Sequence, residues 1–293
     1  MRESGQGTRM NQFSASEAAL EGFRLTRERP GAIFAWAGVY FIGILVMGLL
    51  MMASLGPEFI EIARSGRFTE DADVVGGMLA QSWPAFLLVL IVAVLLMSVL
   101  TAGIYRLVLR PDEKALMHLR LGPDEFRLTT LNLMLFAVGM ACLFIGLLVT
   151  TSVEQVAPGM GVIAAAVLGG VSIWVGVRLC LATPLTFATR RISIPQAWAL
   201  SRGRFWPLFG MIVLAVIFYV MIWLLISIIG LAVVRLSGGE AAMAGGAMSV
   251  AGTIAAFATV IMQLLLSVLQ VVMIYAPFAV AYQQIQGDAL AEG

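Results

Sequence analysis

Six stretches of this 293-residue chain contain no Asp, Glu, Lys or Arg. They are residues 30–57, 74–105, 128–153, 155–177, 205–234 and 241–287. Each is longer than the roughly 20 apolar residues with which an α-helix crosses the hydrocarbon core of a bilayer. A helix on the surface of a soluble protein needs a polar face toward water, and these stretches have none. The sequence therefore predicts an integral membrane protein.

The predicted fold class is all-α, because a backbone in hydrocarbon must satisfy its own hydrogen bonds. We expect one integral membrane domain over residues 1–293, a polytopic transmembrane helical bundle. Its six spans are predicted at about 31–55, 83–109, 128–151, 159–182, 207–235 and 249–282. The first span is too long for the apolar core of a cleavable signal peptide. The last is longer than one crossing needs and contains Pro277, so we expect it to kink or to project into water.

The basic residues are concentrated in three of the segments that flank the spans. The N-terminal segment holds five, the second loop five and the fourth loop four, whereas the other loops hold only Arg64, Arg67 and Arg235. Positive charge resists translocation, so this bias predicts that both termini lie in the cytoplasm. The outer loop 56–82 mixes five acidic residues with apolar ones and predicts two short amphipathic helices. Their carboxylates lack the spacing of a calcium loop and are interpreted as a solvated face.

Two short helices are expected before spans. Ser14 and Glu17 form a capping-box pattern ahead of an apolar segment that stops at Pro30-Gly31. Ser193 and Gln196 form another, ahead of a helix over 194–202 that breaks at Gly203. "FRLTRERPGAIF" (23–34) aligns without gaps on "WALSRGRFWPLF" (198–209). We interpret both as interfacial helices, with apolar residues in the head-group boundary and arginines toward lipid phosphate.

A weaker third copy begins at Arg110-Pro-Asp-Glu113, continues through Leu121 and stops at Gly122-Pro123. The chain then divides into three units of one interfacial helix and two spans, at 13–109, 110–187 and 192–285. The alternative is that any amphipathic helix before a span has this appearance.

The predicted partners are membrane lipids with anionic head groups. The candidate contacts are Arg27, Arg29, Arg120, Arg178, Arg202 and Arg204. A basic residue near an anionic surface is worth about 1 kcal/mol, although plain anchoring of the helices explains the same residues. Arg178 lies inside the fourth span, near its predicted cytoplasmic end. There we expect it to extend to the surface or to bond carbonyls freed by Pro184.

Two polar stripes follow helical spacing. The sixth span carries Thr259, Gln263, Ser267 and Gln270 on one face, and the second carries Ser98, Thr101 and Tyr105. Such stripes pair helices or line a solute path, and we favour pairing. An unpaired amide in the membrane is expensive, so Gln263 is expected to point into the bundle.

Nothing in the sequence suggests catalysis, a cofactor or a metal site. Cys142 and Cys180 lie in or near spans without a neighbouring ligand, and the single histidine, His118, lies in a charged loop. Nucleic-acid binding is not expected, because the basic residues border spans, and no protein partner is indicated. We predict a non-enzymatic scaffold, packing or lipid-homeostasis protein. The alternatives are a small-solute or lipid transporter or channel and, third, a lipid-modifying enzyme.

Several boundary segments resemble those of a known family. They are Arg178-Leu-Cys-Leu-Ala-Thr-Pro184, the turn at 190–191, "AWALSRGRFWPLFG" (197–210), "HLRLGPDEFRL" (118–128) and "APFAVAYQQI" (276–285). They resemble a bacterial family of six-span membrane proteins related to the membrane domain of some glycerophosphoryl diester phosphodiesterases. The phosphodiesterase activity resides in a separate barrel with histidines and paired carboxylates. The resemblance therefore implies a protein of the bacterial inner membrane with the six-span architecture and without that activity.

Overall fold

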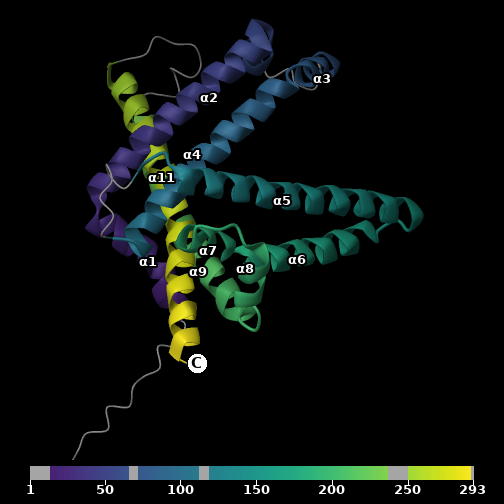
Figure 1. Cartoon of the computed structure of the whole chain (residues 1–293). Coiled ribbons are helices and arrows are strands. Elements are labelled where there is room, and N and C mark those ends of the chain that lie inside the picture. The colour runs from purple at the N-terminus through teal and green to yellow at the C-terminus, as the bar shows by residue number, and fades with distance from the viewer. Residues whose placement is uncertain (1–13, 66–71, 112–118, 237–249, 292–293) are drawn as a thin grey trace, which may run out of the picture.

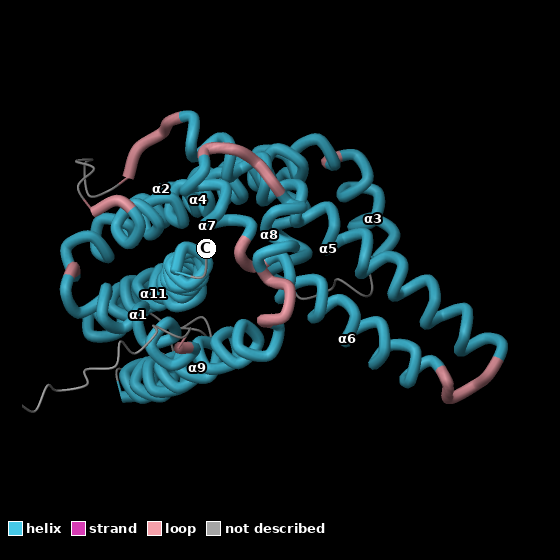
Figure 2. The backbone as a smooth tube through the Cα atoms, turned by 60° about the horizontal axis from the view of Figure 1, so that its bottom comes forward, coloured by secondary structure: helices cyan, strands magenta, loops and turns pink. Residues whose placement is uncertain are grey.

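The computed structural model describes residues 14–65, 72–111, 119–236 and 250–291, and within these ranges it contains helices and no strand (Figures 1 and 2). The helices are α1 (Ala15–Glu28), α2 (Pro30–Ser65), α3 (Ala72–Gln81), α4 (Trp83–Leu109), α5 (Pro123–Val156), α6 (Gly161–Leu179), α7 (Ala182–Thr189), α8 (Ile194–Leu200), α9 (Phe205–Leu236) and α11 (Val250–Ala291).

Six helical segments are long and apolar enough to cross a bilayer. They are Pro30–Gly56, Trp83–Leu109, Pro123–Val156, Gly161–Thr189, Phe205–Leu236 and Gly252–Gly287. The predicted all-α class with six candidate spans is confirmed, and the chain is an integral membrane protein. The long runs without charge explain this result. In hydrocarbon, each such segment must form its backbone hydrogen bonds within a helix.

Most predicted helix ends are confirmed. The Ser14 hydroxyl accepts a hydrogen bond from the backbone N–H of Glu17 at 3.4 Å, and α1 ends just before Pro30. Gly203 has φ of 78°, a left-handed conformation that favours glycine and ends the segment after α8. Ser193 precedes α8 but forms no side-chain cap, so the second capping box is wrong. Pro195 in the first turn of α8 supplies the start instead.

Three other expectations have mixed outcomes. The predicted helix from Arg110 falls mainly on residues 112–118, outside the described residues, and residues 119–122 are not helical. Both outer-loop helices are present, one as the end of α2 after a break at Gly56 (φ of 74°) and the other as α3. The last predicted span continues as the single helix α11, with Pro277 inside it.

The long helices form three hairpins, α2 with α4, α5 with α6, and α9 with α11. These hairpins diverge from a common region, and α5–α6 extends farthest from the others (Figures 1 and 2). The common region, which we call the hub, consists of α1, α7, α8 and the ends of the long helices around them.

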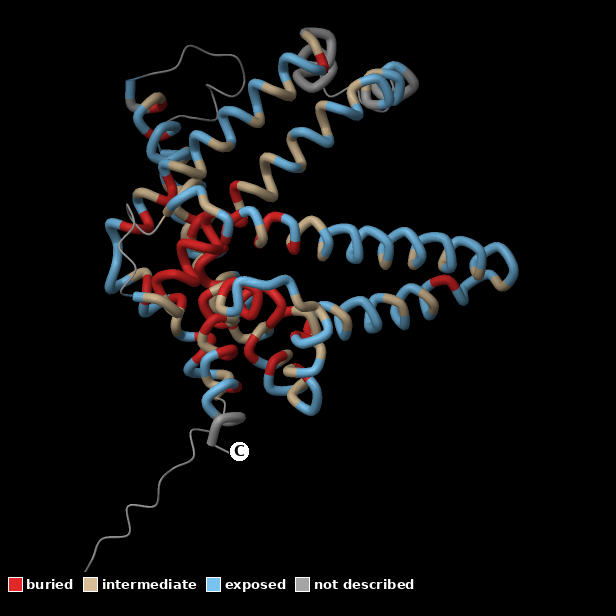
Figure 3. Tube along the Cα trace, in the orientation of Figure 1, coloured by how far each residue is buried: buried red, intermediate tan, exposed pale blue. Residues whose placement is uncertain are grey.

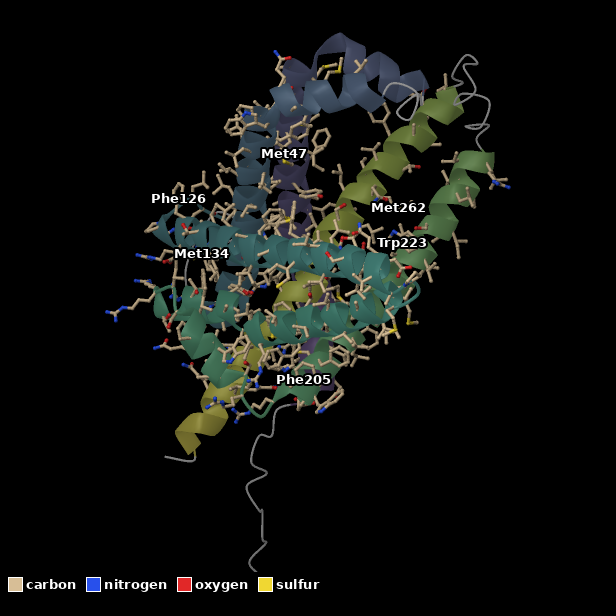
Figure 4. The ribbon with its side chains drawn as sticks, turned by 90° about the vertical axis from the view of Figure 1, so that its right-hand side faces the viewer. Met47, Phe126, Met134, Phe205, Trp223 and Met262 are labelled. Atoms are coloured by element: carbon tan, nitrogen blue, oxygen red, sulfur yellow. The ribbon has the colours of Figure 1, made fainter. Side chains whose placement is uncertain are left out.

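Buried residues gather in the hub (Figure 3). On α5 they are confined to residues 124–131, and on α4 they run from Leu96 to Leu107. The opposite halves, which we call the far halves, are apolar and largely exposed. Trp223 in the far half of α9, which is exposed, is labelled in Figure 4. Exposed apolar surface on this scale fits helices surrounded by hydrocarbon.

The helix α1 packs on protein rather than lying freely in the head-group layer. Its buried face contacts α11 and α9. At Gly22 the helices approach so closely that a Cβ atom there would lie 2.7 Å from the Met273 sulfur. Leu25 is buried in this contact, while Leu20 stays exposed. Helix α11 therefore covers part of the apolar face that was expected in the head-group boundary, and only the exposed apolar residues of α1 remain available to lipid.

The two aligned short helices contact hairpins other than the one each precedes. Helix α1 precedes α2–α4 but packs on α11 and α9, whereas α8 precedes α9–α11 but packs on α6 and α7. Their equivalent rings make similar contacts, Phe23 with Phe218 at 5.5 Å between centroids and Trp198 with Trp174 at 5.1 Å. The division into three repeated units stays a prediction.

Candidate lipid-contact site

The junction between α4 and α5 contains a buried ion pair. Arg106 in the last turn of α4 donates to the carboxylate of Glu125 in the first turn of α5. Their side chains are 1% and 0% exposed. A buried charge is costly unless an opposite charge accompanies it, so these two residues depend on each other. The pair holds two neighbouring hairpins together inside the hub.

A second carboxylate joins the same junction to α7. Asp124 accepts a hydrogen bond from Arg127 at 2.7 Å and lies 3.6 Å from a nitrogen of Arg110. Arg110 also donates to the backbone carbonyls of Phe187 and Ala188, at 2.9 and 3.3 Å, where α7 ends. Its guanidinium lies 4.8 Å from the Phe187 ring centroid. Cations near helix C-termini satisfy the last carbonyls, so we assign this cluster a structural role.

The junction between α6 and α8 is built differently. The Arg178 guanidinium lies 5.4 Å from the ring centroid of Trp174 and 5.5 Å from that of Trp198. The two ring centroids are 5.1 Å apart with their planes at 85°, so the three groups form a nearly equilateral triangle. We call Arg178, Trp174 and Trp198 the arginine–tryptophan site. Each ring stabilises the guanidinium by cation–π attraction.

Two donor atoms of Arg178 lack an acceptor. Nε and Nη1 are buried, and neither forms a hydrogen bond within the described part of the chain. These two atoms therefore do not bond the carbonyls freed by Pro184, which was one of the two expected arrangements. The two tryptophans direct the side chain across α6 toward α8 instead.

The segment of the chain that forms this site carries only positively charged residues. Residues 155–239, which include α6, α7, α8 and α9, contain six arginines and no Asp or Glu. The α4–α5 junction, in contrast, matches its arginines with Asp124 and Glu125. Arg178 is thus a half-buried cation for which α6, α7, α8 and α9 supply no carboxylate.

The other predicted lipid contacts lie on the surface of the hub. Arg27, Arg29, Arg120 and Arg202 are exposed, and Arg204 is half-buried. Their side chains are accessible to a membrane surface, but the structure does not assemble them with Arg178 into one site. Whether they contact lipid stays a prediction.

A groove of about 570 Å³ separates the α5–α6 hairpin from α4, α9 and α11. Its apolar lining includes Leu90, Met97, Phe136, Cys142, Ile212 and Phe278. Asn132, Thr183 and Tyr275 add polar groups to the lining. Most of these polar groups serve helix pairing, so the groove is mainly an apolar recess among candidate spans.

The polar stripe of α4 pairs helices, as predicted. The Ser98 hydroxyl accepts from Asn132 Nδ2 on α5 at 2.9 Å. The hydroxyls of Tyr105 and Thr183 lie 2.6 Å apart and connect α4 with α7. Thr101 is buried and donates to the carbonyl of Met97 in its own helix. Such interhelical bonds keep polar groups satisfied away from water.

The stripe of α11 does not form a buried polar face. Gln263 and Gln270 are exposed, so the expectation that Gln263 points into the bundle is wrong. Ser267 and Thr259 donate to carbonyls of their own helix, at 2.9 and 2.8 Å. Gln270 alone reaches another helix, accepting from the Tyr219 hydroxyl on α9 at 3.3 Å. The divergence of the hairpins leaves this face of α11 uncovered.

The pairing of Arg106 with Glu125 and the role of Trp174 were not predicted from the sequence. Both depend on contacts between elements far apart in the chain. One available signal was the absence of acidic residues over 155–239, which marks Arg178 as a cation without a local partner.

Among the residues that the structure describes, no group of three His, Cys, Asp or Glu side chains is suited to hold a metal ion. Cys142 and Cys180 are free thiols that both line the groove. His118 lies outside the described ranges.

Comparison of the chain with protein-family models, curated proteins and solved structures finds no match. The resemblance to the six-span family therefore stays a prediction.

Proposed function

We propose that this chain is a non-enzymatic scaffold of the bacterial inner membrane whose cytoplasmic hub contacts anionic lipids. The observation that carries the proposal is the distribution of charge over the hairpins. Described arginines of all three basic segments belong to the hub, on α1, at the α4–α5 junction and around α7 and α8. Arg235 lies at the opposite end of α9. By the positive-inside rule, the hub faces the cytoplasm.

The distribution of burial supports a scaffold. The hub is packed and joined by buried ion pairs, whereas the far halves of the hairpins expose apolar side chains to the bilayer. A rigid base with three divergent hairpins presents a large lipid-facing surface while fixing the positions of the arginines. This arrangement suits organisation of surrounding lipid or of other membrane proteins.

A second candidate function is transport of a hydrophobic molecule, and the groove favours it. Its volume of about 570 Å³ falls within the usual range of small-molecule sites, about 300–1,000 Å³. We rank transport second, because two polar groups of the lining, Asn132 and Thr183, are engaged in helix pairing.

The orientation is tested with reporter fusions. A reporter at the C-terminus should be active in the cytoplasm, and one inserted within 237–247 should be active on the opposite side. Reporters on the same side would overturn the six-span orientation.

The choice between scaffold and transporter is tested at Cys142, which lines the groove. In a Cys180→Ala background, Cys142 should resist a water-soluble thiol reagent in intact membranes and react with a membrane-permeant one. Labelling by both reagents at similar rates would establish a water-filled path and favour the transporter. Reaction with both in detergent is the control for an intact thiol.

A further inference from the structure

We propose that the arginine–tryptophan site binds the phosphate group of an anionic membrane lipid. This inference rests on the proposed function, because it requires the hub to face the cytoplasmic lipid surface. It goes beyond general attraction between arginines and lipid, since it assigns one site with defined residues.

The donor groups of Arg178 require an acceptor. A buried donor without a hydrogen bond destabilises a fold, and the guanidinium has two such atoms, Nε and Nη1. Two tryptophans hold the group in place, with centroids 5.4 and 5.5 Å away. An anion from the membrane would reach this half-buried guanidinium at Nη2, the nitrogen that the protein does not cover.

The elements packed against α6 do not provide that anion. Helices α8 and α9 contain no Asp or Glu. The acidic residues of α5 are committed elsewhere, Asp124 and Glu125 to arginines at the α4–α5 junction. Glu154 accepts from the backbone N–H groups of Gly159 and Gly161, at 3.0 and 2.8 Å, at the far end of the hairpin. The acceptor therefore has to come from outside these elements.

The depth of the site identifies the acceptor. Arg178 lies 17 residues beyond Gly161, the first residue of α6, which places it about 26 Å along the helix. The hydrocarbon core is about 30 Å thick, so the site lies near its cytoplasmic boundary. Tryptophan is enriched at this level, and Trp174 is 41% exposed. The abundant anion at that depth is lipid phosphate.

The chemistry of arginine fits this ligand. A guanidinium presents N–H groups in a plane and binds phosphate through paired hydrogen bonds, which a lysine ammonium does not reproduce. The tryptophan rings contribute cation–π attraction and limit the movement of the side chain. The site is thus suited to phosphate by its hydrogen-bonding geometry as well as by its charge.

The test uses the full chain in nanodiscs of phosphatidylcholine with a fraction of phosphatidylglycerol, released in native mass spectrometry to count retained lipids. The wild type should retain phosphatidylglycerol preferentially. Arg178→Gln should weaken this retention about tenfold, as expected for loss of a charge-assisted contact. Arg178→Lys should show a similar loss although its charge is kept. Arg191→Gln removes the same charge from an exposed position on the hub and should lower retention far less.

The outcomes separate the inference from the proposed function. Equal retention by Arg178→Gln and Arg191→Gln, with wild-type preference intact, would overturn this site and leave the proposed lipid-contacting scaffold standing. No preference in the wild type would overturn both. Millimolar inorganic phosphate should leave retention unchanged, and displacement of the lipid by it would identify a site for free phosphate instead. Trp198→Leu, which keeps Arg178, should also lower retention and tests the site in a second folded variant.

Discussion

The two inner junctions of the hub use arginine in opposite ways. At the α4–α5 junction, Arg106 is buried against Glu125, and Arg110 and Arg127 share Asp124. At the α6–α8 junction, Arg178 meets only the faces of Trp174 and Trp198. The first junction pairs its arginines with carboxylates of the chain, although Glu125 Oε2 there accepts no hydrogen bond within the described residues. At the second junction, α6, α8 and α9 supply no carboxylate for Arg178.

This difference is the basis for proposing that Arg106 is structural and that Arg178 binds a ligand. A carboxylate partner within the chain distinguishes the two arginines, whereas their closeness to a span does not. A charge paired inside the protein contributes when the fold forms, and its loss should be measured as stability. A charge without a protein partner contributes when an external anion binds, and its loss should be measured as binding.

The largest expected effect is at the paired junction. Glu125→Gln leaves Arg106 buried without its carboxylate, and breaking such a pair costs about 3–5 kcal/mol. We expect a large fall in the midpoint of thermal unfolding of the purified protein in detergent. The double variant Arg106→Met with Glu125→Leu should recover much of the loss, because apolar residues of similar volume tolerate burial.

A matched control is Glu28→Gln, which breaks the exposed pair with Arg24. Exposed pairs contribute little to stability, so this variant should unfold close to the wild type. Equal effects of Glu125→Gln and Glu28→Gln would contradict the structural role of the buried pair.

The next largest effect concerns Arg178 and depends on lipid. Without anionic lipid, Arg178→Leu should change stability by less than about 1 kcal/mol, because lost cation–π attraction is offset by removal of unsatisfied donors. Addition of phosphatidylglycerol should stabilise the wild type by about 2–3 kcal/mol at lipid concentrations near 100 times Kd. The variant should lack most of this gain. A lipid-dependent shift of the same size in both proteins would remove the contrast between the two junctions.

The candidate spans were predictable from sequence because each depends on local composition. The predicted second span, 83–109, agrees with α4 at both ends, and the stops at Pro30 and Gly203 follow from residue-specific backbone preferences. The divergence of the hairpins was not predictable, because it depends on which helices contact one another. For the same reason the pattern on α11 suggested a buried Gln263, which the divergence leaves exposed.

The candidate site was predictable only in part. Charge inside a span singled out Arg178, but its environment combines Trp174, four residues earlier on α6, with Trp198 from a different helix. Glu125 occupies the first turn of α5, where acidic residues are common for reasons of helix polarity alone. Its pairing with Arg106 requires the fold that brings the two helix ends together.

The contrast between paired and unpaired polar groups also applies to two neutral side chains within the spans. Asn132→Leu removes an amide that donates to Ser98 at 2.9 Å and should cost about 0.6–2 kcal/mol. Gln263→Leu removes an exposed amide and should have almost no effect on unfolding in detergent. Both are measured as shifts in the unfolding midpoint. A greater loss for Gln263→Leu would indicate that its amide is paired in the native state.

The smallest expected effect is at Glu21 on α1. Its carboxyl is half-buried, between the buried Glu125 and the exposed Glu28. Burial raises the pKa of the Glu21 carboxyl more than the nearby Arg24 lowers it. A raised folded-state pKa means that stability is fully present below the unfolded pKa and is lost as pH rises through the folded pKa. Glu21→Gln has no such ionisation, so its stability relative to the wild type should rise between pH 4 and pH 7, by a few tenths of a kcal/mol. Unfolding midpoints at both pH values measure this change. A relative stability that falls over this interval would show that Arg24 outweighs burial, and would place Glu21 with the paired carboxylates of the α4–α5 junction.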